Sequence, residues 1–328
     1  MRTRIHWLAL PLALAVFLLP DRGIAASSAY VQTTEGLDLN RVRFAISAPP
    51  ELTSQLVQRV TALFAEAGLP PLRSDTPPIP FIATLTLTLD PQPLSDVCPG
   101  HVLYSPSLAL TEPVIIPRNS TVINDITWLA HTGAQVRRFV TITDLEHDLE
   151  EFMYQFIADY RAANAGSRSS IPGTAPAAPQ PDTSHPDSAL TAQEPLHSDS
   201  TLKALRIDQL QISVSAGRFS HALTARALQQ FNHAGLALSP GQHHNGRLTL
   251  GVELIQQPLE DRCPGKILYE SGLYLVEQIQ PTRNPRVSIW SDTWLRETTL
   301  VVAPRTQAQL ESNQDALLRQ FIDSLRTH

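Results

Sequence analysis

Several residue types are scarce in this chain, and each scarcity excludes a class of protein. Only two of the 328 residues are cysteines, too few for a disulfide-rich scaffold, and they do not form the Cys-x-x-Cys pair of thioredoxin-type exchange. Lysine and arginine number 25 against 31 acidic residues, which gives a formal net charge of −6. The chain therefore lacks the basic excess of a nucleic-acid-binding protein.

Long apolar runs are also scarce, and the exception lies at the start. Arg2 and Arg4 precede an apolar run from Trp7 to Leu19, and small residues follow near Ala25. Such a run is too short to span about 30 Å of hydrocarbon, so a cleaved export signal over residues 1–26 is expected. Without a cysteine near the cleavage point, a lipid-modified N-terminus is not expected. The mature protein is expected to be periplasmic or secreted, with no transmembrane segment.

The usual catalytic motifs are missing. The chain has no Gly-x-Ser-x-Gly, no His-Glu-x-x-His, no glycine-rich phosphate loop and no Cys-x-x-Cys-His, which lowers the expectation of an enzyme. His243 and His244 are adjacent, but no third ligand has a supporting spacing, so a solvated loop is favoured over a metal site. We expect no cofactor and no metal.

The clearest positive feature is a segment that occurs twice at an offset of 165. Residues 98–119 and 263–284 share ten of 22 aligned positions, which favours an internal duplication. The shared positions include Cys-Pro-Gly, a later Leu-Tyr pair, a glutamate and an Arg-Asn pair. We expect two tandem domains, over residues 40–164 and 201–328.

Between the predicted domains, residues 165–200 contain 6 prolines and 7 serines. This composition is typical of a disordered linker, because it has too few apolar residues to offset the entropy lost on ordering. Residues 41–164 have 8 arginines against 13 acidic residues, a net of −5, and residues 201–328 have 13 basic against 11 acidic residues, a net of +2. Net charges of opposite sign favour contact between the domains, although a few exposed charges usually only keep a surface hydrated.

Each predicted domain has the order strand, helix, three strands, helix. The fold class is α+β: a mainly antiparallel meander with both helices on one face. Hydrophobic stripes predict the helices, and glycines at positions 68 and 235 end the first helix of each domain. The expected strands cover 42–47, 84–89, 102–116 and 122–130, and then 205–214, 248–254, 267–279 and 287–295. Asp144 and Thr306 are the expected N-caps of the closing helices.

Cys98 and Cys263 occupy equivalent positions in the two domains. In an oxidising compartment the simplest hypothesis is a Cys98–Cys263 disulfide that joins the domains and closes a long loop of the chain. The chain-entropy model gives such a bond about 5 kcal/mol. Two separate thiols or intermolecular bonds remain alternatives.

The other repeated polar and aromatic residues are candidate partner contacts: Glu112, Arg118, Trp128, Glu277, Arg283 and Trp294. Each glutamate lies six residues before its arginine, about 20 Å along a strand, too far for direct pairing. Pro117-Arg118-Asn119-Ser120 and its counterpart are typical of hairpin turns, so a structural role for Arg-Asn competes with partner binding. Trp128 and Trp294, and likewise Tyr104 and Tyr269, suit either a core rim or a binding surface.

One set of residues resembles a type of uncharacterised exported bacterial domain: Leu108-x-Leu110-x-Glu112, Arg118, Thr127-Trp128 and the helix end from Phe156 to Asn164. The resemblance covers somewhat more than half of each domain, and the second domain departs from it because its last helix lacks the Tyr-x-x-Ala-Asn tail. The resemblance implies export and an α+β module, and it implies no known activity.

These features favour an exported non-catalytic protein that binds another cell-envelope component, as an accessory subunit or assembly factor. The alternative is a small-ligand receptor or hydrolase with its site in a groove between the domains. Arg118 with Glu277, or Arg283 with Glu112, would line that groove.

Overall fold

The computed structural model describes residues 33–72, 83–165, 199–241 and 247–327. The predicted export signal, nearly all of the predicted linker and the pair His243-His244 lie outside these ranges. The described part is a mixed α+β structure with four α-helices and a large mixed sheet. None of the described helices is long and apolar enough to cross a membrane.

The main elements of the N-terminal half are β1 (Val42–Ser47), α1 (Pro50–Glu66), β2 (Ala83–Thr88), β5 (Ser107–Ile116), β6 (Thr121–His131) and α2 (Ile142–Asn164). Those of the C-terminal half are β8 (Gln211–Ser215), α3 (Ser220–His233), β10 (Thr249–Pro258), β11 (Ile267–Pro281), β12 (Ile289–Val302) and α4 (Gln307–Arg326). Short strands also occur: β3 (Gln92–Pro93), β4 (Val102–Tyr104), β7 (Gln135–Arg137) and β9 (Ser239–Pro240). Four 3₁₀ turns complete the described elements: η1 (Leu39–Arg41), η3 (Asp199–Leu202), η4 (Ile207–Gln209) and η5 (Gly217–Phe219).

The pairing of the first two strands differs from the expected meander. β1 runs parallel to β2, and β8 runs parallel to β10, because a helix intervenes and returns the chain to the same end of the sheet. The later pairs are antiparallel, with β5 between β2 and β6, and β11 between β10 and β12. The main sheet has the order β1-β2-β5-β11-β10-β8-β9, with β6 on β5 and β12 on β11.

Several boundaries also differ from the sequence prediction, and the strand expected over 287–295 continues as β12 to Val302. The strand expected over 102–116 is broken into β4 and β5, because Pro106 has no N–H for a continuous ladder; β4 pairs instead with β3 and β7. The strand expected from Leu205 begins only at Gln211, after η4. The N-cap of α2 is Thr141, and Asp144 sits at N3 of a capping box. Thr306 is confirmed as the N-cap of α4.

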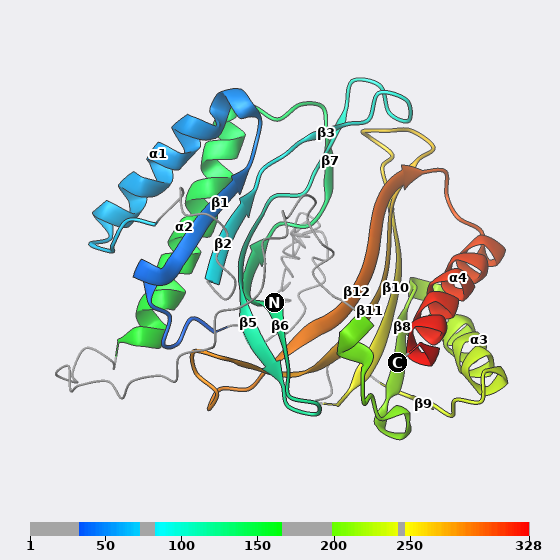
Figure 1. The fold of residues 1–328 in the computed structure, drawn as a ribbon. Coiled ribbons are helices and arrows are strands. Elements are labelled where there is room, and N and C mark those ends of the chain that lie inside the picture. The colour runs from blue at the N-terminus through cyan, green and yellow to red at the C-terminus, as the bar shows by residue number, and fades with distance from the viewer. Residues whose placement is uncertain (1–32, 73–82, 166–198, 242–246, 328) are drawn as a thin grey trace, which may run out of the picture.

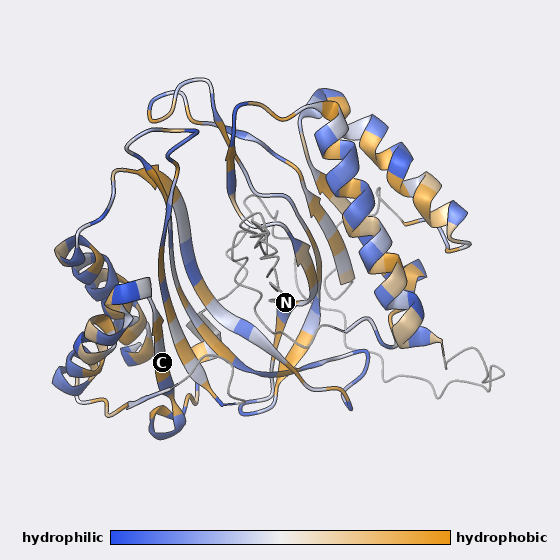
Figure 2. Ribbon diagram, turned by 180° about the vertical axis from the view of Figure 1, so that it is seen from behind, coloured by the Kyte–Doolittle hydropathy of each residue, from blue (hydrophilic) through white to orange (hydrophobic). Residues whose placement is uncertain are grey.

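The helices lie on the outer side of the strands in each half, so that the strands of the two halves face each other between two helix pairs (Figure 1). Hydrophobic and hydrophilic residues alternate along all four helices (Figure 2), which matches their one buried stripe. The first core contains Phe64, Trp128 and Phe156. The second contains Phe231, Trp294 and Phe321. Each half therefore buries a core of its own.

The halves meet at two opposite ends of the strands. At one end the long hairpins β5–β6 and β11–β12 cross (Figure 1), and Ile115 and Val114 pair with Gln280 and Pro281. An apolar cluster fills this crossing: Val114, Ile116, Ile279 and Ile289, with Ile123 and Val287 at its margin. At the other end, a smaller cluster surrounds Cys98 and Cys263.

Candidate functional site

The strongest concentration of buried charge lies where the two hairpins cross. Arg118 and Asn119 form part of the turn between β5 and β6, and Arg283 and Asn284 lie in the turn between β11 and β12. Each turn contacts the other half of the chain. We call these turns and their contacts the hairpin crossing.

Arg118 binds the C-terminal half through its whole guanidinium group. Its Nε lies 2.6 Å from Oε2 of Glu277 and its Nη2 lies 3.0 Å from Oε1, a bidentate ion pair. The same guanidinium donates to the backbone carbonyls of Thr201 and Lys203. Glu277 also accepts a hydrogen bond from the Thr293 hydroxyl.

Arg283 makes the same contacts in the opposite direction. Its Nε lies 2.6 Å from Oε2 of Glu112 and its Nη2 lies 2.9 Å from Oε1. It also donates to the backbone carbonyls of Thr33, at 2.9 Å, and Glu35. Glu112 accepts from the Thr127 hydroxyl. The two ion pairs therefore form a reciprocal set.

Both ion pairs are largely withdrawn from water. The side-chain exposure is 17% for Arg118 and 5% for Glu277, and 13% for Arg283 and 3% for Glu112. Charges in such surroundings are costly unless hydrogen bonds satisfy them. Here each guanidinium binds one carboxylate and two carbonyls, so the pairs hold the two halves together and do not line an open groove.

A further buried carboxyl, that of Asp125, lies on β6 beside the crossing. Asp125 is 1% exposed, and this burial raises its pKa well above the ordinary value of 3.8; the nearby Asp292 and Glu277 carboxylates act in the same direction. The Ile126 backbone N–H, at 2.7 Å, and the Ser291 hydroxyl oppose the increase in pKa. Asp125 thus keeps its proton to a higher pH in the folded chain.

The two candidate tryptophans belong to the cores. Trp128 packs edge-on against Phe156, with ring centroids 5.1 Å apart, and donates its N–H to Asp159 at 2.9 Å. Trp294 packs in the same way against Phe321 at 5.2 Å. Both are at most 1% exposed, so their contacts lie inside their own half.

Tyr104 and Tyr269 are also fully buried beside the closing helices. The hydroxyl of Tyr104 donates to Asp148 at 2.8 Å, and that of Tyr269 accepts from Asn313 at 2.9 Å. Burial and the adjacent Asp148 carboxylate raise the pKa of Tyr104. These phenols anchor α2 and α4 to the strands.

The two cysteines join the halves at the end opposite the hairpin crossing. Cys98 and Cys263 form a disulfide with their Cα atoms 5.8 Å apart. Around it lie Val136, Leu259, Leu268 and Val301. Arg262 adds a polar contact between halves by donating to the carbonyl of Val136 at 2.9 Å. The described halves are therefore joined at one end by the disulfide and at the other by the two ion pairs of the hairpin crossing.

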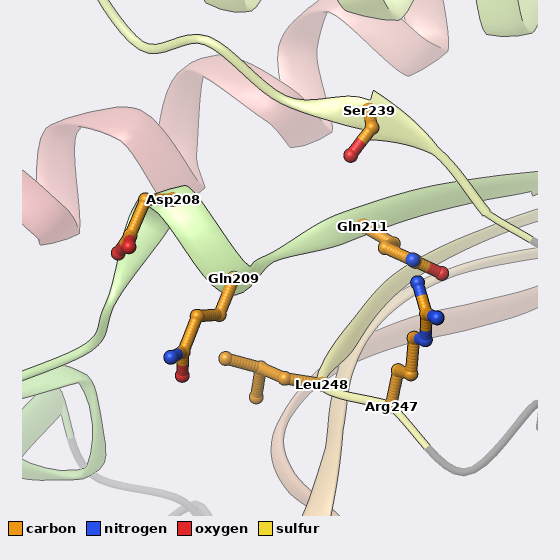
Figure 3. Close-up of a pocket in the computed structure, with 6 residues that line it drawn as sticks. All are labelled: Asp208, Gln209, Gln211, Ser239, Arg247 and Leu248. Carbon is orange, nitrogen blue, oxygen red and sulfur yellow. The ribbon is translucent and has the colours of Figure 1, made fainter.

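A pocket lies at the edge of the C-terminal sheet, beside η4, β8 and β9 (Figure 3). It is lined by Asp208, Gln209, Gln211, Ser239, Arg247 and Leu248. Asp208 forms an ion pair with the neighbouring Arg206 at 2.7 Å. Five of these six side chains carry hydrogen-bonding groups and Leu248 is apolar, but they include no histidine, cysteine or carboxylate pair. Within the described ranges, no group of three or more His, Cys, Asp or Glu residues is arranged to hold a metal ion.

The sequence does not indicate the carbonyl partners of the arginines: Thr33–Glu35 lie before the first predicted domain, and Thr201–Lys203 are the first residues of the second. Thr33–Glu35 and Thr201–Lys203 lead into the two halves, and each segment is followed by a left-handed residue, Gly36 or Ala204. Thr34 and Thr201 are both fully buried. Asn164 also binds the first segment, through Gly36 and the carbonyl of Thr34.

No model of a known protein family matches the sequence, and no curated protein matches it. A minor lipoprotein from Acinetobacter baumannii aligns at 15% identity and a TM-score of 0.20, over 35% of this chain and 91% of that one. A putative lipoprotein from Caulobacter crescentus aligns at 14% identity and a TM-score of 0.20, over 39% and 92% of the two chains. At these TM-scores the likeness carries no functional conclusion.

Proposed function

We propose that this chain is an exported, non-catalytic protein of two tandem α+β repeats that binds another component of the cell envelope. The Cys98–Cys263 disulfide supports export, because such bonds persist in oxidising compartments and are rare in the cytosol. The shared order of elements and the reciprocal ion pairs support the two repeats. In this proposal the protein is an accessory subunit or assembly factor.

The observation that carries partner binding is the outer edge of β1. β1 is the first strand in the order of the main sheet, and among the described residues it pairs only with β2. In the C-terminal half the equivalent edge of β8 is covered by β9. An uncovered strand edge is a template for pairing with an extended segment of another protein.

The backbone groups available on β1 follow from its parallel pairing. The carbonyl of Ser47 accepts from the N–H of Leu89 at 2.7 Å, so the backbone of Ser47, Ala45 and Arg43 is directed toward β2. Val42, Phe44 and Ile46 direct their backbone N–H and C=O groups to the outside. The side chains of Val42 and Phe44 are buried, so an added strand would contact mainly backbone there.

Ile46 gives a direct test with a matched control. Ile46→Pro removes an outward N–H without breaking the ladder to β2, whereas Ile46→Ala removes the same packing and keeps the N–H. After crosslinking in the native cell envelope, we expect a specific partner with the wild type and with Ile46→Ala, and at least a tenfold lower recovery with Ile46→Pro. Equal recovery with both variants would exclude β1, and recovery of the wild type only as a lone chain would exclude the proposed function.

A further inference from the structure

The hairpin crossing is self-complementary, since each half contributes both sides of the contact. The N-terminal half supplies an arginine, Arg118, and the receiving glutamate, Glu112, with the Thr127 hydroxyl. The C-terminal half supplies Arg283, Glu277 and the Thr293 hydroxyl in the same roles. Such a two-way contact has the form of an isologous interface between two protein subunits.

The disulfide, at the end opposite the hairpin crossing, is also a contact to which each half contributes the same group. Cys98 comes from one half and Cys263 from the other, and each cysteine sits in a turn closed by the same backbone bonds. The N–H of Cys98 binds the carbonyl of Leu94 at 2.8 Å, and that of Cys263 binds the carbonyl of Leu259 at 2.7 Å. No contact of the crossing or the disulfide requires the two halves to belong to the same chain.

The peptide connection between the halves is long enough to allow an exchange. Residues 166–198 separate the last described residue of one half from the first of the other, and a chain of 33 residues extends to at most about 110 Å. Exchange of equal units across such a connection makes a dimer with the same contacts as the monomer.

We infer that the partner this surface fits is a second copy of the chain, and that two chains exchange halves. In the exchanged dimer Arg118 of one chain binds Glu277 of the other, and Cys98 of one chain bonds to Cys263 of the other. This inference concerns association of the chain with itself and does not depend on the envelope partner or on the β1 edge.

The fraction of exchanged dimer should depend on the protein concentration, because the exchange leaves the contacts between the halves unchanged. A closed monomer and an exchanged dimer have the same interfaces, so the balance depends on the effective concentration of one half near the other, which is in the millimolar range for short connections. Refolding at about 100 µM should therefore place on the order of a tenth of the chains in exchanged dimers. Oxidation would then retain these dimers through two interchain disulfides.

Two full-length single-cysteine variants provide the decisive experiment. Cys98→Ser and Cys263→Ser, carrying tags of different mass, are refolded separately and together under oxidising conditions. We expect the mixture to give a heterodimer linked between Cys98 and Cys263, at least five times more abundant than linked homodimers. All three linkages in statistical amounts, or no linked species, would overturn the inference.

Two additional measurements distinguish a specific exchange from random thiol oxidation. Arg118→Glu is added to the Cys263→Ser chain and Glu277→Arg to the Cys98→Ser chain. The heterodimer yield should rise several-fold, because each closed monomer then holds two like charges at the crossing and only the exchanged heterodimer restores opposite charges. The matched control is Arg59→Ala in the Cys263→Ser chain, which removes an ion pair with Glu150 inside one half and should leave the yield unchanged. A yield that the charge exchange does not raise above that of the control would contradict the inference. The second measurement refolds the wild-type protein at protein concentrations from about 5 to about 200 µM. The fraction of disulfide-linked dimer should rise at least fivefold over this range, and a constant fraction would also contradict the inference.

Discussion

Arg118 in the β5–β6 turn and Glu277 on β11 lie 159 residues apart in the chain and form a bidentate ion pair between its two halves. Arg283 and Glu112 form the corresponding pair in the opposite direction. The four residues recur at the same spacing in the sequence, and their shared role explains the recurrence. They join the halves of the molecule, and each arginine also holds the segment that leads into the opposite half.

Removing one member of an ion pair should destabilise the protein strongly. Arg118→Ala leaves Glu277 buried without its counter-charge, and we expect the free energy of unfolding to fall by about 3–5 kcal/mol. The double variant Arg118→Leu with Glu277→Leu should lose less than either single variant, because no charge remains buried. Urea denaturation checks both. A loss of only about 0.5 kcal/mol in a single variant, as for an exposed ion pair, would show that the pair does not hold the halves together.

The reduced protein should be less stable than the oxidised one. Replacing both cysteines by serine removes the link across a 165-residue separation, and we expect a loss of about 3–5 kcal/mol in the free energy of unfolding. Equilibrium denaturation of the double variant, compared with the oxidised wild type, measures this. Equal midpoints and slopes would mean that the disulfide does not restrict the unfolded chain.

Asp125 should make stability fall as the pH rises. Its pKa is raised in the folded chain above the ordinary value of 3.8, so its stabilising contribution is complete below that ordinary value and is lost as the pH rises toward the folded pKa. Relative to the wild type, Asp125→Asn should therefore gain stability as the pH is raised above the ordinary pKa of 3.8, measured by denaturation at each pH.

Asp144 provides a control, because the pH dependence of its contribution to stability has the opposite sign. Its bonds with Thr141 lower its pKa, so its contribution is present above the ordinary pKa and is lost as the pH falls through the folded one. Asp144→Asn should lose stability relative to the wild type at pH 7, and the difference should shrink in acid. Parallel pH profiles for the two variants would contradict this assignment.

The left-handed residues before each half give a paired prediction. Ala204 has a φ of 60° and Gly36 has a φ of 73°, a backbone region that costs an alanine roughly 1 kcal/mol or more relative to glycine. Ala204→Gly should raise the free energy of unfolding by about 0.5–1 kcal/mol, and Gly36→Ala should lower it by a similar amount. Thermal denaturation of both variants measures the difference. Changes of the same sign would show that these residues do not keep the same conformation.

The sequence predicted the helices and most strands, because hydrophobic periodicity depends on which face is buried. Gly68 and Gly235 end α1 and α3 in the left-handed conformation as expected. The parallel pairing of β1 with β2 depends on the direction of the chain after α1, which periodicity does not record. Likewise, Pro106 interrupts the strand that the hydrophobic pattern continues.

The sequence identified the residues of the hairpin crossing but not their geometry. Within one half, Glu112 and Arg118 are too far apart to pair, and pairing becomes possible only when the hairpins cross. From the sequence, the combinations Arg118 with Glu277 and Arg283 with Glu112 are candidates for the lining of a groove. The structure brings them together as buried ion pairs, because the carbonyls of the preceding segments satisfy their remaining donors.

Export and the connection between the halves are tested most directly by peptide mapping, without reduction, of the protein isolated from its native cells. An exported protein whose halves are joined at both ends should be found in the envelope or secreted fraction, lacking the predicted export signal and with the Cys98 and Cys263 peptides linked. Recovery from the cytoplasm with both cysteines freely alkylated would contradict export and the connection between the halves together.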